Sequence, residues 1–123
     1  MANLGAVWAF MQGMQAYRRR AMARLSGSPC VVRLTYLGGH PGIFEQEEFW
    51  VGRVSDQLRL VDRRGDRWYD LPLERIGGLA CDDQGRVAVA FEPTAGLRLT
   101  VAFQAEAGGE EDLRKLRTMV AEG

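Results

Sequence analysis

The chain has 123 residues, of which 46% are hydrophobic and 26% charged, and its formal net charge is zero. This is the length and composition of one ordinary globular domain. Residues 1–30 contain four arginines and no acid, so the rest of the chain, with 12 basic and 16 acidic residues, has a net charge of −4. An acidic body argues against broad electrostatic capture of nucleic acid.

The start of the chain does not resemble a secretory signal, because the arginines follow the apolar run. That run, Leu4 to Met11, is too short to span a bilayer. Cys30 and Cys81 match no metal or redox spacing, and we expect two small buried apolar side chains in a reducing compartment. These observations predict a cytoplasmic protein, with attachment to a membrane surface as the alternative.

Residues 3–25 are expected to form an amphipathic helix, which Gly13 and Arg18 weaken. "SGSP" (26–29) then ends the helix and begins a linker. We therefore divide the chain into a helix with its linker (1–29) and a β-domain (30–123). On a helical wheel one side collects large apolar residues: Leu4, Val7, Trp8, Met11, Met14, Met22 and Leu25.

Residues 30–104 alternate between apolar and polar side chains in short runs, and turn sequences separate these runs. "RRGD" (63–66) is a typical hairpin turn, because Gly65 can adopt positive φ. Gly52 is expected to mark a bend or bulge within its strand. The predicted strands are 30–37, 47–54, 57–62, 67–71, 73–81, 86–92 and 97–104.

Residues 109–122 predict a closing helix with acids in its first turn and basic residues later, which suits the helix dipole. Leu113, Leu116 and Val120 form its apolar face. A short helix of this kind is marginal alone, so it should pack on the sheet.

Leu58–Leu79 and Leu97–Val120, which cover strands, a "LPLERIGGL" corner and the closing helix, resemble the bacterial pleckstrin-homology-like domains related to GRAM domains. The resemblance extends over residues 30–122. It implies a mainly β fold with flanking helices: a PH-like split barrel of about seven antiparallel strands and a C-terminal capping helix. Such domains bind lipid headgroups, peptides or proteins. The N-terminal helix is an addition to the family pattern.

The first-hairpin loop departs from the members that bind phosphoinositides, which carry basic residues there. In this chain the loop holds Glu45, Glu47 and Glu48 and no Lys or Arg. An anionic headgroup would be repelled at this place. We therefore do not expect phosphoinositide binding.

A second resemblance is to the Sm-like RNA-binding barrels, which pair an N-terminal helix with five bent strands. The hairpin at 86–104 and the C-terminal helix exceed the elements of that fold. The acidic net charge of residues 31–123 also does not suit RNA binding. An Sm-like RNA binder remains an alternative function.

His40 and the nearby glutamates are the candidates for chemistry. His40 could act as a general base or a metal ligand, although an exposed loop residue is the simpler interpretation. The glutamates could bind a divalent metal or could simply be solvated. The sequence contains no established catalytic or phosphate-binding motif. We expect a non-enzymatic protein without a metal or cofactor.

Arg67, Trp68 and Tyr69 combine charge with aromatic rings and form a weak candidate surface site. Four acids interleave with the arginines of this stretch, so cross-strand ion pairs are the simpler interpretation.

The N-terminal helix is the strongest candidate interaction surface. Its apolar side could pack on its own barrel, on a second copy, on a partner protein or on a membrane. We expect a binding or scaffolding module that uses this helix for self-association or partner docking.

Overall fold

The computed structural model describes residues 4–106 and 109–121. Within them helix α1 (Leu4–Arg24) precedes seven strands, and helix α2 (Glu110–Ala121) follows them. The expected mainly β fold with two flanking helices is confirmed, and the predicted boundaries are correct to within two residues for most elements. The strands are β1 (Val31–Gly38), β2 (Glu48–Val54), β3 (Gln57–Asp62), β4 (Trp68–Pro72), β5 (Ile76–Cys81), β6 (Arg86–Thr94) and β7 (Leu97–Ala105).

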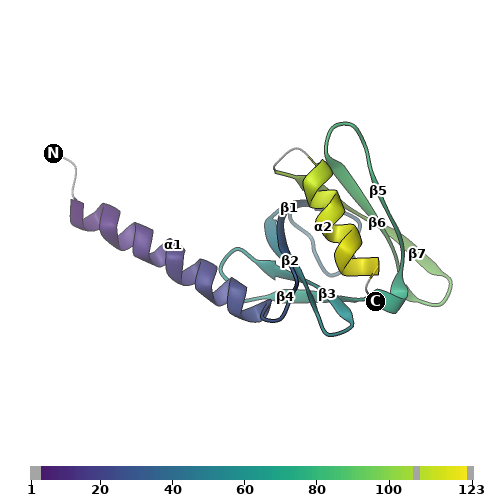
Figure 1. The fold of residues 1–123 in the computed structure, drawn as a ribbon, viewed down its shortest axis with the longest axis horizontal. Helices are drawn as coiled ribbons and strands as arrows, with labels where there is room; N and C mark the ends of the chain where they lie inside the picture. The colour runs from purple at the N-terminus through teal and green to yellow at the C-terminus, as the bar shows by residue number, and fades with distance from the viewer. Residues whose placement is uncertain (1–3, 107–108, 122–123) are drawn as a thin grey trace.

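All of these strands belong to one antiparallel sheet with the order β4-β3-β2-β1-β7-β6-β5. Strand β1 joins the two halves, because it pairs with β2 on one side and with β7 on the other. The edge strands β4 and β5 are separated in sequence only by the short helix η1 (Leu73–Arg75). The sheet therefore curves around a core without closing, and α2 lies along its open side (Figure 1).

The main core lies inside this curve. Alternate residues of β1, β2 and β3 point inward, as the period of two requires. Helix α2 contributes Leu116 and Met119, which are fully buried, and it contacts β1, β2 and β5. Cys30 and Cys81 are half buried against the same core.

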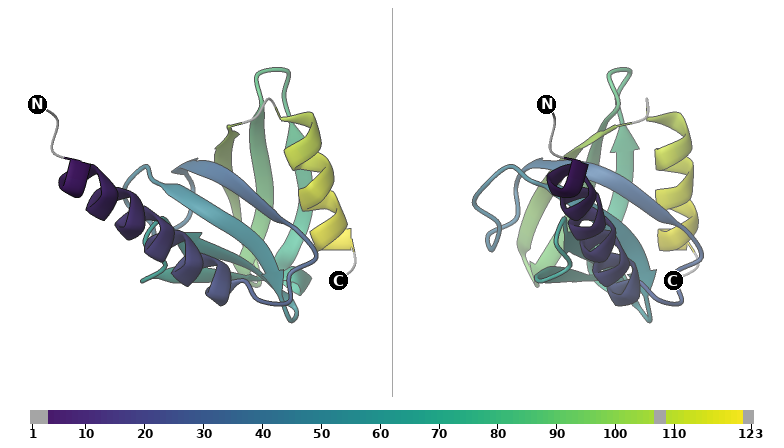
Figure 2. Two further views of the ribbon diagram at one scale, coloured as in Figure 1. Left: turned by 60° about the vertical axis from the view of Figure 1, so that its left-hand side comes forward. Right: turned by 90° about the vertical axis from the view of Figure 1, so that its left-hand side faces the viewer.

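Helix α1 lies outside this core and projects away from the sheet (Figure 2). Its last turn and the residue that follows pack on the outer face, where Ala21, Leu25 and Val61 form a small separate cluster. One turn earlier, Arg18 and Tyr17 contact Trp50 and Arg64, respectively. We call the curved sheet and α2 together the body. Intramolecular packing therefore accounts for the end of the predicted apolar stripe and not for its first half.

Two glycines explain how α1 reaches the body. Gly52 was expected to bend its strand, but β2 keeps a regular register there with both neighbours. A Cβ at Gly52 would meet the Ser28 side chain at 2.8 Å, so this glycine leaves room for the linker. Gly65, in the β3–β4 turn, has φ +77° as expected, and a Cβ there would meet the backbone N of Ala21 at 2.6 Å.

Replacing Gly65 by Ala should therefore disturb the junction of α1 with the body. Gly96→Ala is the matched control, because Gly96 has φ +86° but nothing within 4 Å of the added Cβ. We expect Gly96→Ala to cost about 1 kcal/mol from backbone strain. Gly65→Ala should cost roughly 2–4 kcal/mol, since strain and a clash add. Urea unfolding of both variants measures this difference, and equal costs would show that the close approach carries no energy.

Candidate functional site

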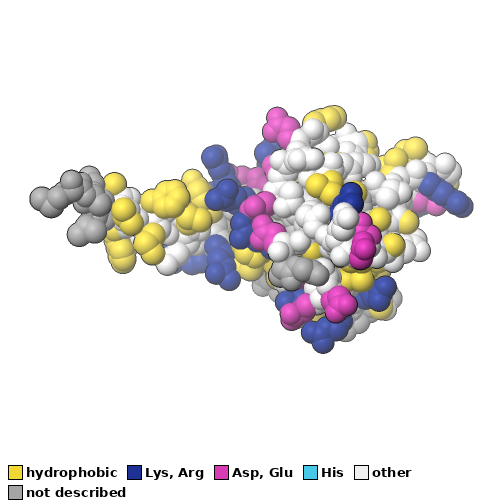
Figure 3. All heavy atoms as spheres, turned by 90° about the horizontal axis from the view of Figure 1, so that it is seen from above, with side chains coloured by type: hydrophobic (Ala, Val, Ile, Leu, Met, Phe, Trp, Pro, Cys, Tyr) yellow, Lys and Arg dark blue, Asp and Glu magenta, His cyan; other side chains and the backbone are white. Residues whose placement is uncertain are grey.

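The outer part of α1 exposes large apolar side chains. Six of them are between 40% and 67% exposed, and they are Val7, Trp8, Phe10, Met11, Met14 and Tyr17. Seen from above, hydrophobic side chains run along the projecting helix, and basic ones gather where it meets the body (Figure 3). The side chain of Leu4 lies outside the described residues. Of the other predicted contact residues, Met22 is half buried at the base, whereas Val7, Trp8, Met11 and Met14 remain exposed.

A regular spacing of three and four residues relates the exposed part of α1 to its buried base. Val7, Phe10, Met14, Tyr17 and Ala21 follow this spacing, which places them on one side of a helix. We call these five residues the body-facing seam. Ala21 is fully buried against the sheet, so the rest of the seam is turned toward the side on which the body lies. The sequence prediction missed Phe10 and Tyr17, although the three-four spacing identifies them.

A groove of about 1160 Å³ lies between α1 and the outer face of β1–β3, and we call it the helix–sheet groove. Its helix wall includes Phe10, Met14 and Tyr17 of the seam. The complete lining is Phe10, Met14, Gln15, Tyr17, Arg18, Arg33, Glu47, Glu48, Trp50, Asp62, Arg63, Arg64, Asp66 and Arg67.

Trp50 forms the floor of this groove between two arginines. The guanidinium carbon of Arg18 lies 5.7 Å from the ring centroid of Trp50, and that of Arg33 lies 5.3 Å from it. Arg33 also donates to Glu48 at 2.5 Å, and this hydrogen bond lowers the pKa of the Glu48 carboxyl. Arg18, which interrupts the stripe in the sequence, thus faces the body and holds α1 over Trp50.

The acids of the groove are paired with arginines. Asp66 accepts from Arg20 of α1 at 2.6 Å, across the junction. The guanidinium of Arg67 lies 3.6 Å from Asp62 and 3.9 Å from Glu47. Because positive and negative side chains alternate along its wall, the groove is not organised to bind an anion.

The stretch Arg67, Trp68 and Tyr69 does not form one surface. Trp68 lies on the outer face beneath two arginines, with the guanidinium carbon of Arg24 4.5 Å and that of Arg59 5.6 Å from its ring centroid. Tyr69, which we expected at the surface, points inward and packs edge-on against Phe49. Consecutive strand residues point to opposite faces, so these two rings cannot act together. Trp68 instead helps to seat the end of α1.

His40 is packed rather than exposed in a loop. Its ring is stacked on Phe91, with ring centroids 6.1 Å apart, and lies edge-on to Tyr69 at 5.8 Å. It therefore fills the space between β4 and β6. The backbone N–H of Gly42 donates to Nδ1 at 2.9 Å, which places the proton of the neutral ring on Nε2. Burial lowers the pKa of His40.

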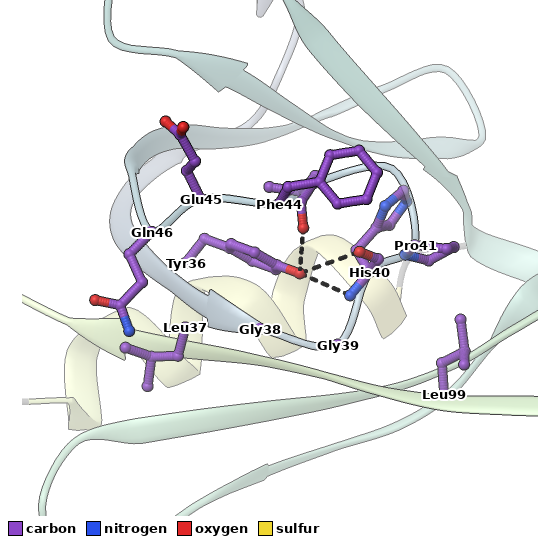
Figure 4. Close-up of a pocket in the computed structure, with 11 residues that line it drawn as sticks. Tyr36, Leu37, Gly38, Gly39, His40, Pro41, Phe44, Glu45, Gln46 and Leu99 are labelled. Carbon is purple, nitrogen blue, oxygen red and sulfur yellow. Dashed lines mark hydrogen bonds between the residues drawn. The ribbon is translucent and has the colours of Figure 1, made fainter.

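The loop that carries His40 is closed on itself by Tyr36. The backbone N–H of His40 donates to the Tyr36 hydroxyl at 2.7 Å, and this hydroxyl lies 3.2 Å from the carbonyl oxygens of His40 and Ile43 (Figure 4). A cavity of about 480 Å³ lies beside this loop, with Phe44 and Leu99 in its lining. From these contacts we infer that His40 is a packing residue that helps to fix the conformation of the loop.

The three loop glutamates do not converge. Glu48 binds Arg33, Glu47 lies near Arg67, and Glu45 is exposed. Among the described residues, no group of three or more histidines, cysteines or acids is arranged to hold a metal ion.

Comparison with known proteins identifies the fold and no activity. No family model matches the chain, and no curated protein matches it. Among solved structures, the chain is similar to the C-terminal domain of an unknown protein from Leishmania infantum, with a TM-score of 0.61 and 8% identity. The match covers 87% of this chain and 97% of that one. At this identity the likeness concerns the fold alone.

A helix that spans a bilayer needs about 20 predominantly apolar residues. Neither α1 nor α2, within residues 4–106 and 109–121, is long and apolar enough to cross a membrane.

The packing of His40 predicts a dependence of stability on pH. The pKa of His40 in the folded protein lies below its ordinary value of 6.5. Between the folded pKa and 6.5, the unfolded chain therefore binds more protons than the folded chain. The contribution of neutral His40 is complete above pH 6.5 and is lost as the pH falls toward the folded pKa. Asn at this position can accept the Gly42 N–H but cannot titrate. Urea unfolding between about pH 7 and 5 should therefore show a flatter decline for His40→Asn; parallel curves would contradict the assignment.

Proposed function

We propose that this chain is a non-enzymatic binding or scaffolding module of the pleckstrin-homology-like kind, in which α1 docks on a second copy or on a partner protein. The observation that carries the proposal is the exposed seam of α1 (Val7, Phe10, Met14 and Tyr17), held in place by a firmly packed base. Most helices in proteins are stabilised by packing of their apolar side. The projecting part of α1 lacks this stabilisation as long as its apolar side stays exposed. Exposed apolar patches of this kind mark interaction sites.

The body supports this proposal by the way it fixes the helix. Arg20 binds Asp66, and Arg24 donates from Nε to the carbonyl oxygen of Gly65 at 3.3 Å. Arg59 donates to Asp70 and, at 3.1 Å, to the carbonyl oxygen of Arg24. These contacts orient α1 without covering its outer part, which suits a helix presented to another molecule. The PH-like part of the proposal draws on the strand order with its closing helix.

A docking role predicts that charge in the exposed seam leaves the folded chain stable. We expect Phe10→Glu to change the free energy of unfolding by less than about 0.5 kcal/mol, because the Phe10 side chain is 67% exposed. Leu60→Ala, in the fully buried core, is the comparison and should cost roughly 2–5 kcal/mol. Urea unfolding at low protein concentration measures both. A loss for Phe10→Glu as large as that for Leu60→Ala would assign the seam to intramolecular packing and would refute the docking role.

A further inference from the structure

We infer that the occupant of the exposed seam is the α1 helix of a second copy, packed antiparallel about a twofold axis. This inference rests on the proposed function and names its partner. The seam has the three-four spacing that helix pairs use, and over residues 7–17 it carries no charged side chain. A helix with the same seam is therefore a matching partner, and in a twofold dimer the same patch serves both copies.

The position of the arginines selects the antiparallel orientation. Arg18, Arg19 and Arg20 follow directly after the exposed seam. A parallel pair would set the two arginine clusters side by side, at the roughly 8–10 Å that separate packed helices. An antiparallel pair centred between Phe10 and Met14 sets the clusters about 20 Å apart at 1.5 Å per residue. That distance exceeds the screening length of about 10 Å at 0.1 M salt, so the clusters do not repel.

The helix–sheet groove can accommodate the N-terminal part of the second α1 helix. In the antiparallel arrangement Val7 of one copy lies beside Tyr17 of the other, and Tyr17 is part of the groove wall. The exposed apolar area of two such helices is on the order of 1,000 Å², which is the size that a specific interface requires.

The same geometry disfavours a flat membrane as the occupant. The exposed seam is on the side of α1 whose base, Ala21, is buried on the body, so a flat surface touching the seam would meet the body. A second helix is narrow enough to lie along the seam.

The test is the mass of the full-length chain by sedimentation velocity, from micromolar to submillimolar concentration. We expect twice the monomer mass of 13.7 kDa. Phe10→Glu should raise the dimer dissociation constant at least about 100-fold, because the dimer would bury an unpaired charge. Gln12→Glu, which adds the same charge at an exposed position away from the seam, is the matched control and should remain dimeric.

The orientation is tested by mixing two variants. The antiparallel pairing sets Phe10 of one copy opposite Met14 of the other. Phe10→Glu and Met14→Lys should each be monomeric alone, and an equimolar mixture should recover dimer mass through the new Glu–Lys pair. A parallel dimer sets each position against itself, so it would show no recovery and would overturn the antiparallel arrangement.

A wild-type chain that stays monomeric at every concentration would overturn the inference. If Phe10→Glu is then as stable as wild type, the docking role survives with a different occupant. Flotation with phosphatidylserine–phosphatidylcholine vesicles separates the remaining cases. Vesicle binding that Phe10→Glu abolishes would show that a membrane occupies the seam, and the absence of vesicle binding would leave another protein as the occupant.

Discussion

Gly65 lies against the backbone of α1, and the arrangement outside the core depends on this contact. The β3–β4 turn can approach Arg20 and Ala21 so closely only because Gly65 lacks a side chain and adopts positive φ. The approach brings Asp66 to Arg20, and it places the Gly65 carbonyl within reach of Arg24. One turn of the helix is thereby held on the sheet, and the direction of the remaining helix follows from it.

This contact divides a continuous apolar side into two parts with different roles. The base, at Ala21 and Leu25, stabilises the chain, whereas the exposed part of the seam is left for another molecule. The same contact also explains the role of the basic residues at the end of α1. Arg18, Arg20 and Arg24 each face a group of the body, so the +4 charge of the first 30 residues is used largely to seat the helix.

Most strands were predictable because apolar and polar residues alternate along them. Val32, Leu34 and Tyr36 are buried while their neighbours are not, as the sequence indicated. The candidate site was predicted only in part. The predicted apolar side of α1 included Trp8 and Met11 and omitted Phe10 and Tyr17, which line the groove. Similarly, Tyr69 was expected beside Trp68 at the surface, and the pleat sends it inward to Phe49 and His40.

The sequence by itself determined the order and type of the helices and strands, which face of most strands is apolar, and that Gly65 permits a tight turn. These depend on periodicity and on residues near one another in the chain. The tertiary structure alone decided where α1 leaves the body, that His40 is packed between Phe91 and Tyr69, and that Trp50 lies between Arg18 and Arg33. Those contacts join residues far apart in the sequence, so no local pattern contains them.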